Sequence, residues 1–209
     1  MGGLFITFEG VEGSGKSTQL GALALRLKGM DREVVETREP GGTRIGNQIR
    51  QILLKRRNHR MTLVTELLLY AASRAQLTQE LIKPSLEAGR IVLCDRFADA
   101  TLAYQGYGRD LPLDLIDRLN RLATQGISPR LTLLLDLDPE VGLKRIAQER
   151  DLDRLEGEEL AFHRRVREGY LKLAEQEPDR IKIVAADRDT ATIEEKVWGY
   201  VAPLLRGQG

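Results

Sequence analysis

Short apolar runs alternate along the chain with longer segments in which apolar residues recur every three or four positions. The runs are rich in Leu, Ile, Val and Phe, which favours buried strands, and they lie at residues 4–8, 33–37, 91–94, 131–137 and 181–185. The periodic segments predict helices at residues 17–28, 45–53, 62–83 and 112–125, from Pro139 onward, in the segment that ends near Glu177, and from about Thr192. This alternation predicts an α/β fold: a doubly wound, five-stranded parallel sheet with helices on both faces.

We predict a single domain over residues 1–209, because no Pro/Ser-rich linker, repeat or low-complexity tract interrupts the chain. Residues 150–157 are densely charged and poor in apolar side chains, so they have little to contribute to a core. We interpret this part as a short mobile lid that spans about residues 145–160.

The charge balance excludes some classes of function. The chain has 32 Lys and Arg against 31 Asp and Glu, a net charge of +1, which excludes a nucleic-acid binder that relies on bulk basic charge. The chain has a single cysteine, Cys94, which excludes an internal disulfide. Its two histidines, His59 and His163, lie far apart and do not match a metal-binding spacing. No apolar stretch approaches the ~18 residues of a membrane span. We therefore expect a cytoplasmic protein without membrane or nucleic-acid partners.

The turn after the first predicted strand reads GVEGSGKS and matches the phosphate-binding pattern G-x-x-x-x-G-K-[ST] at every fixed position. Glycines let consecutive backbone N–H groups converge on phosphate oxygens, and the following helix adds its positive N-terminal end. Lys16 is expected to reach the β- and γ-phosphates, and the Ser17 hydroxyl to bind Mg²⁺. The predicted nucleotide-binding residues are Gly10, Val11, Glu12, Gly13, Ser14, Gly15, Lys16, Ser17 and Thr18. The fold is therefore expected to be of the P-loop NTPase type.

The phosphate loop alone leaves the reaction open between a switch GTPase and a phosphotransferase. A GTPase needs a D-x-x-G after the second or third strand and an N-K-x-D that reads guanine. Neither pattern occurs in the sequence. Their absence favours a kinase or an ATPase.

Charged residues at strand ends supply the other half of a candidate site, because ligands bind at the carboxyl ends of strands in an open α/β sheet. Asp95 ends the third predicted strand and is the expected Mg²⁺ carboxylate, with Asp136 at the end of the fourth strand as its rival. Arg96 follows Asp95, and its guanidinium can hold a phosphate through two hydrogen bonds. Arg38 ends the second strand and is expected opposite the phosphate loop.

Tyr70 and Arg74 lie four residues apart, on one face of the long predicted helix. An aromatic ring and a guanidinium in this arrangement can stack on a base and hydrogen-bond to it. The plain alternative is a core tyrosine beside a solvated arginine.

Taken together, six segments resemble the thymidylate kinase family, in its order and at its spacing. They are residues 11–18, 37–43, Tyr70 with 74–76, 95–97, 103–106 and 152–154. The segments REPGGT and AYQG are specific to that family, whereas many families share the phosphate loop. The resemblance covers about residues 4–175. It implies phosphoryl transfer from ATP to dTMP with Mg²⁺, by a bacterial-type enzyme whose lid carries a catalytic arginine.

The resemblance also implies roles for single residues. Glu12 is expected near the deoxyribose 3′-hydroxyl, and Arg38 and Arg96 are expected to bind the dTMP phosphate. Tyr70 would stack on thymine, and Arg74 would contact the carbonyl edge of that base.

Further residues complete the expected substrate pocket. Thr101 would face the thymine N3 edge, Tyr104 would crowd the ribose 2′ position, and Gln105 would complete that wall. Ala100 stands where the family often has serine, which removes one polar contact. Residues 185–190 lie where the family cradles adenine.

Position 13 is a glycine and not an arginine. The resemblance therefore implies that an arginine of the lid neutralises the negative charge of the transition state. Arginines crowd this part of the chain, at positions 145, 150, 154, 164, 165 and 167. Arg150 lies about one residue from the expected position, which leaves the role open between Arg150 and Arg154. Lys16 and Arg96 complete the expected catalytic set.

Two other functions stay open. The chain could be another nucleoside monophosphate kinase with the same machinery, or a P-loop ATPase that serves as a binding or switching module without a small acceptor. The family is typically a homodimer, and the long helix has leucines at 63, 67, 68, 69, 77 and 81. This is more apolar than one buried face requires, so the helix serves either a dimer contact or the core.

Overall fold

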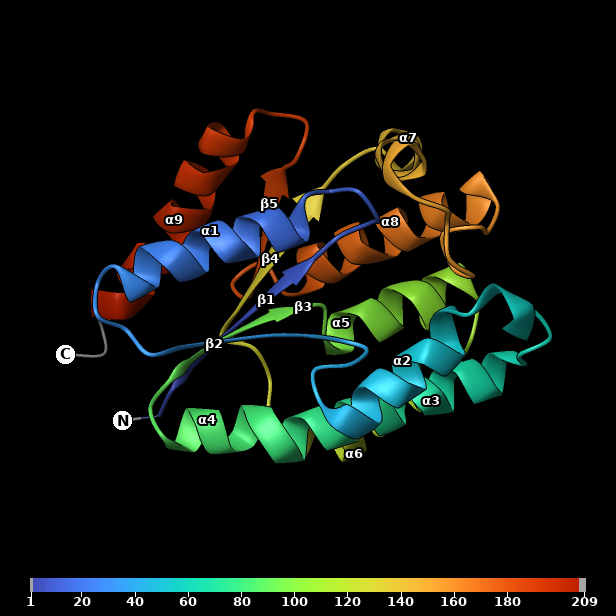
Figure 1. Cartoon of the computed structure of the whole chain (residues 1–209), viewed down its shortest axis with the longest axis horizontal. Coiled ribbons are helices and arrows are strands. Elements are labelled where there is room, and N and C mark those ends of the chain that lie inside the picture. Colours follow the sequence, from blue (N-terminus) through green and yellow to red (C-terminus); the bar gives the residue numbers. More distant parts are fainter. Residues whose placement is uncertain (1, 207–209) are drawn as a thin grey trace.

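The computed structural model describes residues 2–206 (Figure 1), so Met1 and residues 207–209 of the predicted domain lie outside the described range. A sheet of parallel strands forms its centre, with β1 (Leu4–Glu9), β2 (Val34–Arg38), β3 (Ile91–Asp95), β4 (Leu131–Asp136) and β5 (Ile181–Ala185). The strand order is β2-β3-β1-β4-β5. The five predicted strands are confirmed, and their ends differ from the predicted ones by at most one residue.

Helices connect the strands and flank the sheet. Their bounds are α1 (Lys16–Lys28), α2 (Arg44–Leu54), the 3₁₀-helix η1 (Arg56–Asn58), α3 (Leu63–Leu77), the π-helix η2 (Thr78–Ile82), α4 (Lys83–Glu87), α5 (Ala98–Thr101), the π-helix η3 (Leu102–Gly108), α6 (Leu113–Thr124), α7 (Pro139–Glu149), α8 (Leu160–Gln176) and α9 (Thr190–Arg206). Thr62 caps α3, because its side chain accepts a hydrogen bond from the Thr65 backbone N–H. Within residues 2–206, no helix is both long and apolar enough to span a bilayer.

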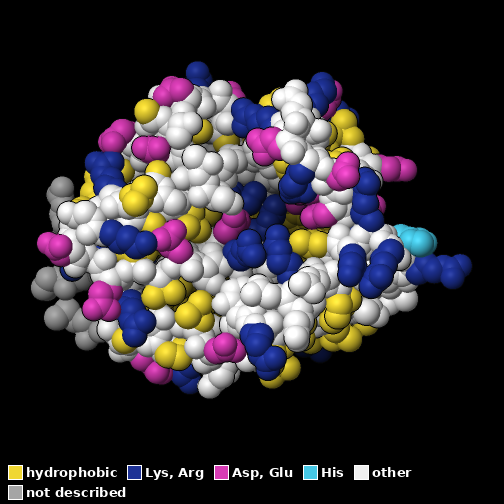
Figure 2. All heavy atoms as spheres, viewed as in Figure 1, with side chains coloured by type: hydrophobic (Ala, Val, Ile, Leu, Met, Phe, Trp, Pro, Cys, Tyr) yellow, Lys and Arg dark blue, Asp and Glu magenta, His cyan; other side chains and the backbone are white. Residues whose placement is uncertain are grey.

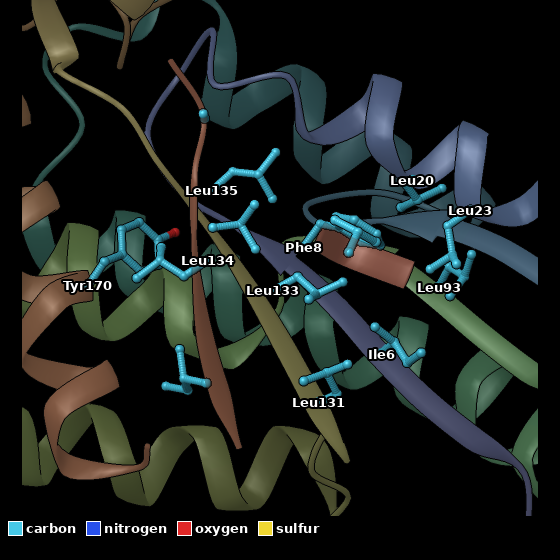
Figure 3. Close-up of a cluster of buried hydrophobic side chains, with 14 of the residues drawn as sticks. Ile6, Phe8, Leu20, Leu23, Leu93, Leu131, Leu133, Leu134, Leu135 and Tyr170 are labelled. Atoms are coloured by element: carbon cyan, nitrogen blue, oxygen red, sulfur yellow. The ribbon is translucent and has the colours of Figure 1, made fainter. Parts of the chain in front are cut away.

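Helices cover both faces of the sheet, as predicted (Figure 1). The helices α1 and α9 pack together over one face, while α4 and α8 contact strands from the other side. In Figure 3, Leu20 and Leu23 of α1 lie on the same side of the strands as Phe8, and Tyr170 of α8 lies on the opposite side beside Leu134. Every residue of β1 is buried. Burial on both faces explains why this strand is mostly apolar and does not alternate between apolar and polar residues.

A helical segment is present where the sequence predicts a long helix over residues 62–83, but it is not one continuous α-helix. It runs as α3, changes to the π-helix η2 at Thr78, and continues as α4 to Glu87. Pro84 lies in the first turn of α4, where its missing N–H breaks no bond within that short helix. The wider π turn therefore accommodates a proline that an uninterrupted α-helix would not.

Residues 98–108, which carry no helical prediction, form the short helix α5 and the π-helix η3. Their helical form depends on close packing against α8. A Cβ on Gly108 would crowd Phe162, and one on Gly169 of α8 would crowd the Tyr107 ring. Small residues let two helices approach closely, and this tertiary contact leaves no periodic apolar signal in the sequence.

The strand order creates a switch point at the carboxyl end of β1. The chain moves to β3 and β2 on one side of β1, and to β4 and β5 on the other. In the register of the sheet, Phe8 lies beside Asp95, and Asp95 lies beside Arg38. The strand ends that carry the predicted site residues therefore lie at one edge, where α/β proteins bind ligands.

Candidate active site

The phosphate loop, residues 10–17, joins β1 to α1 and is shaped by glycines with positive φ. Gly10, Gly13 and Gly15 have φ values of 135°, 69° and 86°, which side chains rarely tolerate. A Cβ on Gly10 would overlap the Leu135 carbonyl oxygen, so only glycine fits there. The loop delivers the chain to the N-terminus of α1, where free N–H groups and the helix dipole favour anions.

Lys16 lies in the cradle of this loop. Its Nζ donates hydrogen bonds to the carbonyl oxygens of Gly10 and Val11, at 3.1 and 2.7 Å, and to Ser14 Oγ at 3.3 Å. Burial, together with the nearby positive charge of Arg96, lowers the pKa of Lys16 to about 8. A phosphate group in the loop would favour the charged ammonium and raise that pKa.

Asp95, and not its rival Asp136, lies beside the hydroxyl of the phosphate loop. Ser17 Oγ donates a hydrogen bond to Asp95 Oδ2 at 2.6 Å. Asp136 instead accepts hydrogen bonds from Arg167 on both oxygens, at 2.7 and 2.8 Å. A carboxylate that a guanidinium holds on both oxygens has little freedom to bind a cation. The geometry therefore favours Asp95 of the two predicted metal carboxylates.

A cavity of about 630 Å³ opens beside the phosphate loop. Its walls include residues 12–19, residues 38–40, Tyr70 and residues 188–190. Figure 2 shows a hollow near the middle of this face, with Lys and Arg side chains gathered in it. Residues 188–190 belong to the region that is predicted to lie near adenine. This region, the phosphate loop and the predicted acceptor residues Arg38 and Tyr70 therefore line one cavity.

Arg38, Arg50 and Arg96 come from different elements and line the same cavity. Arg38 is exposed at the end of β2. Arg50 of α2 donates to the Pro40 carbonyl oxygen at 2.9 Å. Burial, and then the positive charges of Arg38 and Arg96, lower the pKa of Arg50. The positive charges of Arg38 and Arg96 therefore lie close to Arg50, and a cluster of guanidinium groups of this kind favours the binding of an anion.

Glu12 connects the phosphate loop to these cations. Its Oε1 accepts hydrogen bonds from Arg96 Nη2 at 3.0 Å and from the Tyr104 hydroxyl at 2.5 Å. Burial by itself would raise the pKa of Glu12, but Arg96 and the neighbouring donors hold it well below its usual range. Arg96 also donates to the Tyr170 hydroxyl at 3.2 Å. Its left-handed backbone, with φ of 70°, is an unusual conformation for arginine and is typical of functional positions.

Arg74 is buried, with 1% of its surface exposed, so the alternative of a solvated arginine is wrong. Its guanidinium forms an ion pair with Glu39 and donates to Asn120 Oδ1 at 2.5 Å and to Thr101 Oγ1 at 2.6 Å. Tyr70, one helical turn earlier, is also buried, and both side chains line the cavity. The predicted common face of Tyr70 and Arg74 is therefore the face turned toward the site.

The two candidate lid arginines have different surroundings. Arg150 is half exposed, lines the cavity, and donates to both carboxylate oxygens of Glu156, at 2.7 and 2.6 Å. The side chain of Arg154 is only 8% exposed; its Nε donates to the Leu53 carbonyl oxygen at 2.7 Å, and its Nη2 pairs with Glu66 at 2.6 Å. Among the described residues, Arg154 is not part of the cavity wall. The geometry favours Arg150 for contact with a ligand and gives Arg154 an anchoring contact with α2 and α3.

Glu9 is a buried carboxyl at the end of β1 that the sequence interpretation passed over. Its Oε1 accepts the Phe97 backbone N–H at 2.7 Å, and its Oε2 accepts the Tyr170 hydroxyl at 2.7 Å. Burial, with a further contribution from Asp99, raises the pKa of Glu9 to about 8. Glu9 therefore keeps its proton at neutral pH, while Glu12 three residues later is ionised.

The raised pKa of Glu9 predicts a pH dependence of stability. Because the pKa is higher in the folded state than in the unfolded chain, Glu9 contributes stability that is complete below about pH 4.5 and is lost as the pH rises toward about 8. We expect the Tm of the wild type to fall across this window, and the fall to be smaller in Glu9→Gln. Thermal unfolding followed by circular dichroism measures both. Glu33→Gln, at an exposed carboxylate, is the matched control; equal slopes for Glu9→Gln and the wild type would contradict the assignment.

Comparison with known proteins decides the family. A sequence profile of the family "Thymidylate kinase" matches residues 8–197. The thymidylate kinase of Exiguobacterium sp. is 50% identical over 209 residues, which cover 100% of this chain and 99% of that protein. The corresponding protein of Geotalea uraniireducens is 54% identical over 210 residues, with 97% and 98% covered.

The chain belongs to the thymidylate kinase family.

A solved structure agrees with this assignment at the level of the fold. The crystal structure of thymidylate kinase from Ehrlichia chaffeensis is 35% identical in sequence and superposes with a TM-score of 0.78, covering 96% of this chain and 99% of that one. The five-stranded parallel sheet with flanking helices is thus the thymidylate kinase fold, and the predicted P-loop NTPase class is confirmed.

The thymidylate kinase fold gathers most of the predicted site residues around one cavity. Those in its wall are Glu12, Gly13, Ser14, Gly15, Lys16, Ser17, Thr18, Arg38, Tyr70, Arg74, Asp95, Arg96, Thr101, Tyr104, Gln105 and Arg150. Gly10 and Val11, the first two residues of the loop, are not part of the cavity wall. Their carbonyl oxygens accept hydrogen bonds from Lys16. Gln105 also donates to Glu66 at 2.9 Å, which links this wall to the Arg154 anchor.

Arg50 and Glu9 are the site residues that the sequence interpretation missed. Arg50 lies in a basic stretch that resembles any solvated helix face, and its role becomes visible only when Arg38 and Arg96 are placed beside it. Glu9 did carry a signal, because an acidic residue that ends a mostly apolar strand must be either exposed or paired with hydrogen-bond donors. The structure shows that it is satisfied.

Proposed function

We propose that the chain transfers the γ-phosphoryl group of ATP to dTMP, giving dTDP and ADP. The observation that carries the proposal is the single cavity that joins a phosphate loop to a buried aromatic and arginine pocket at Tyr70 and Arg74. Arg96 adjoins both parts, because its charge lowers the pKa of Lys16 in the loop and opposes the rise in the pKa of Tyr70. A triphosphate donor and a monophosphate acceptor can therefore meet end to end at Arg96.

In this proposal ATP acts with Mg²⁺. The Ser17 hydroxyl and the Asp95 carboxylate offer two oxygen ligands of the kind that Mg²⁺ prefers, and they lie 2.6 Å apart at the mouth of the loop. The residues present therefore fit the cation. When bound, Mg²⁺ neutralises charge on the transferred phosphoryl group and on the leaving phosphates.

The side chains of the cavity act by binding and orienting charge. Lys16 is placed to bind the phosphates in the loop, and Arg38, Arg50 and Arg96 are placed to bind the acceptor phosphate. An acceptor phosphate is already an anion, so the reaction needs alignment and charge neutralisation more than a strong general base. Closure of the lid segment would bring Arg150 to the γ-phosphoryl group and exclude water, which protects ATP from hydrolysis.

Tyr104 is the residue that we expect to select deoxyribose. Its ring is held edge-on by Phe162 and Tyr170, at centroid distances of 6.1 and 6.2 Å, and its hydroxyl is bound to Glu12. The ring is therefore a rigid wall rather than a side chain that can move aside for a 2′-hydroxyl.

A panel of acceptors tests the proposed function. We expect dTMP to give the highest kcat/KM in an ADP-release assay, and its ribo-analogue to be a poorer acceptor. Tyr104→Phe should keep the preference for dTMP over its ribo-analogue, because the bulk of the ring excludes the 2′-hydroxyl. Tyr104→Ala should reduce the difference between the two acceptors. If AMP or CMP were the best acceptor, the assignment of dTMP as the substrate would be refuted, and the chain would still be a nucleoside monophosphate kinase. ATP hydrolysis that no monophosphate accelerates would favour an ATPase module.

We also propose that the active form is a homodimer of single-domain chains. Leu63, Val64 and Leu68 on α3 are 39%, 54% and 50% exposed, which makes an apolar strip on the surface of one helix. A second copy of the same helix would cover that strip in a twofold contact. Sedimentation velocity should give twice the mass of the chain.

The cytoplasmic location stays a prediction that cell fractionation measures.

A further inference from the structure

His163 is a fully buried side chain to which the proposed reaction gives no role. It lies on α8 with no exposed surface, and its ring packs edge-on against Phe162 at a centroid distance of 5.2 Å. Neither of its ring nitrogens has a hydrogen-bond partner among residues 2–206. Buried polar groups are nearly always paired, so an imidazole with two unpaired nitrogens requires an explanation.

The group that faces His163 is Glu12. The imidazole Nδ1 lies 3.5 Å from Glu12 Oε2. That oxygen is itself buried and has no hydrogen-bond partner in the described part of the chain, whereas Oε1 accepts from Arg96 and Tyr104. An unpaired donor site and an unpaired acceptor thus face each other, and a small approach completes a hydrogen bond to a charged group.

The backbone of Glu12 has little freedom to adjust. A Cβ on Gly142 of α7 would overlap the Glu12 carbonyl oxygen, so helix and loop touch backbone to backbone at this point. What remains free is the rotation of the Glu12 side chain. Arg96 and Tyr104 hold one oxygen, and a contact on the other oxygen is what fixes the plane of the carboxylate.

We propose that His163 is a positioning residue for the acceptor sugar, whose Nδ1–H holds Glu12 Oε2 and so orients the carboxylate toward the 3′-hydroxyl. This rests on the proposed function. Each carboxylate oxygen accepts about two hydrogen bonds. Oε1 already accepts from Arg96 and Tyr104, so the sugar hydroxyl would share Oε2 with His163. Within the described residues, His163 is not part of the cavity wall and Glu12 is. His163 therefore acts on the sugar through Glu12.

The first test is the preference for a 3′-hydroxyl. We compare kcat/KM for dTMP with that for 3′-deoxythymidine monophosphate, in the wild type, His163→Leu and His163→Asn. In His163→Leu the preference should fall by about tenfold, mainly through a higher KM for dTMP. In His163→Asn it should be restored, because the amide nitrogen of Asn takes nearly the place of Nδ1. A packing defect would weaken both acceptors equally, so an unchanged ratio in a folded Leu variant, or no rescue by Asn, would overturn the proposal.

The second test needs no variant of His163 and no turnover. The chain has only two histidines, and His59 is exposed, so His59→Gln leaves a single imidazole to observe by ¹⁵N NMR. We expect His163 to carry a proton on Nδ1, and its ¹⁵N shift to move in Glu12→Gln. An imidazole protonated on Nε2 alone would overturn the proposal. Failure of the wild type to phosphorylate dTMP would instead refute the proposed function, so the two failures are distinguishable.

Discussion

Replacing Arg150 with alanine should lower kcat by about 10³-fold and leave dTMP binding close to that of the wild type. Arg150 lines the cavity but is paired with Glu156, through two hydrogen bonds and an ion pair at 2.6 Å. An arginine held at the rim by a neighbouring carboxylate gives little to substrate binding. In the proposed mechanism it contributes when the lid brings it to the phosphoryl group in transfer, so its loss should appear in kcat rather than in KM.

Two matched variants make the Arg150 experiment decisive. Arg154→Ala should lower the Tm more than Arg150→Ala does, because it removes a buried ion pair and leaves the Glu66 carboxylate to its longer ion pair with Arg109. Arg164→Ala, at an exposed position of α8, should change neither kcat nor Tm. Single-turnover rates and dTMP titrations should be measured for all three. A 10³-fold loss in Arg154→Ala with normal turnover in Arg150→Ala would reverse the assignment.

Lys16→Ala should reduce phosphoryl transfer by about 10²-fold or more, equivalent to about 3 kcal/mol of transition-state stabilisation. The Nζ of Lys16 lies inside the loop, bound to the Gly10 and Val11 carbonyl oxygens. In the proposed mechanism it is the ammonium that meets the charge that develops between the β- and γ-phosphates. The side chain is also buried, with 7% of its surface exposed.

A lysine at the other end of the same helix is the control for Lys16. Lys28 ends α1 and pairs with Glu36 on the surface, so Lys28→Ala should keep normal turnover. Circular dichroism should confirm that both variants keep the helical content of the wild type. Turnover in Lys16→Ala close to that of Lys28→Ala would remove the phosphate loop from the proposed mechanism.

Local patterns were enough to predict the five strands and their places in the chain, but not their order in the sheet. The central strands β1, β3 and β4 are largely apolar and almost wholly buried, and the glycine turn of the phosphate loop matches a spacing that backbone geometry imposes. The segment 98–108 shows where this reasoning ends. Its π-helix exists because Gly108 and Gly169 let it approach α8, and a contact between segments some sixty residues apart leaves no period in either.

The candidate site divides in the same way. The phosphate-loop motif was sufficient to select Lys16, and strand-end positions indicated Arg96 and also Asp95, with Asp136 as its rival. The hydrogen bond from Ser17 to Asp95 separates the two carboxylates in the folded chain. The choice between Arg150 and Arg154 was beyond the sequence, since both are arginines in one charged segment. Burial beside Glu66 separates them in the folded chain.

The chain's order of apolar runs, glycines and strand-end charges determines its family, its sheet and the place of its phosphate loop, because each depends on neighbours a few residues apart. Folding decides how the charges pair. It leaves Glu9 protonated and Glu12 ionised, although both are buried carboxyls three residues apart. The physical reason is that burial raises both pKa values, and only at Glu12 do the charges and donors that folding brings together, Arg96 foremost, outweigh burial in sum.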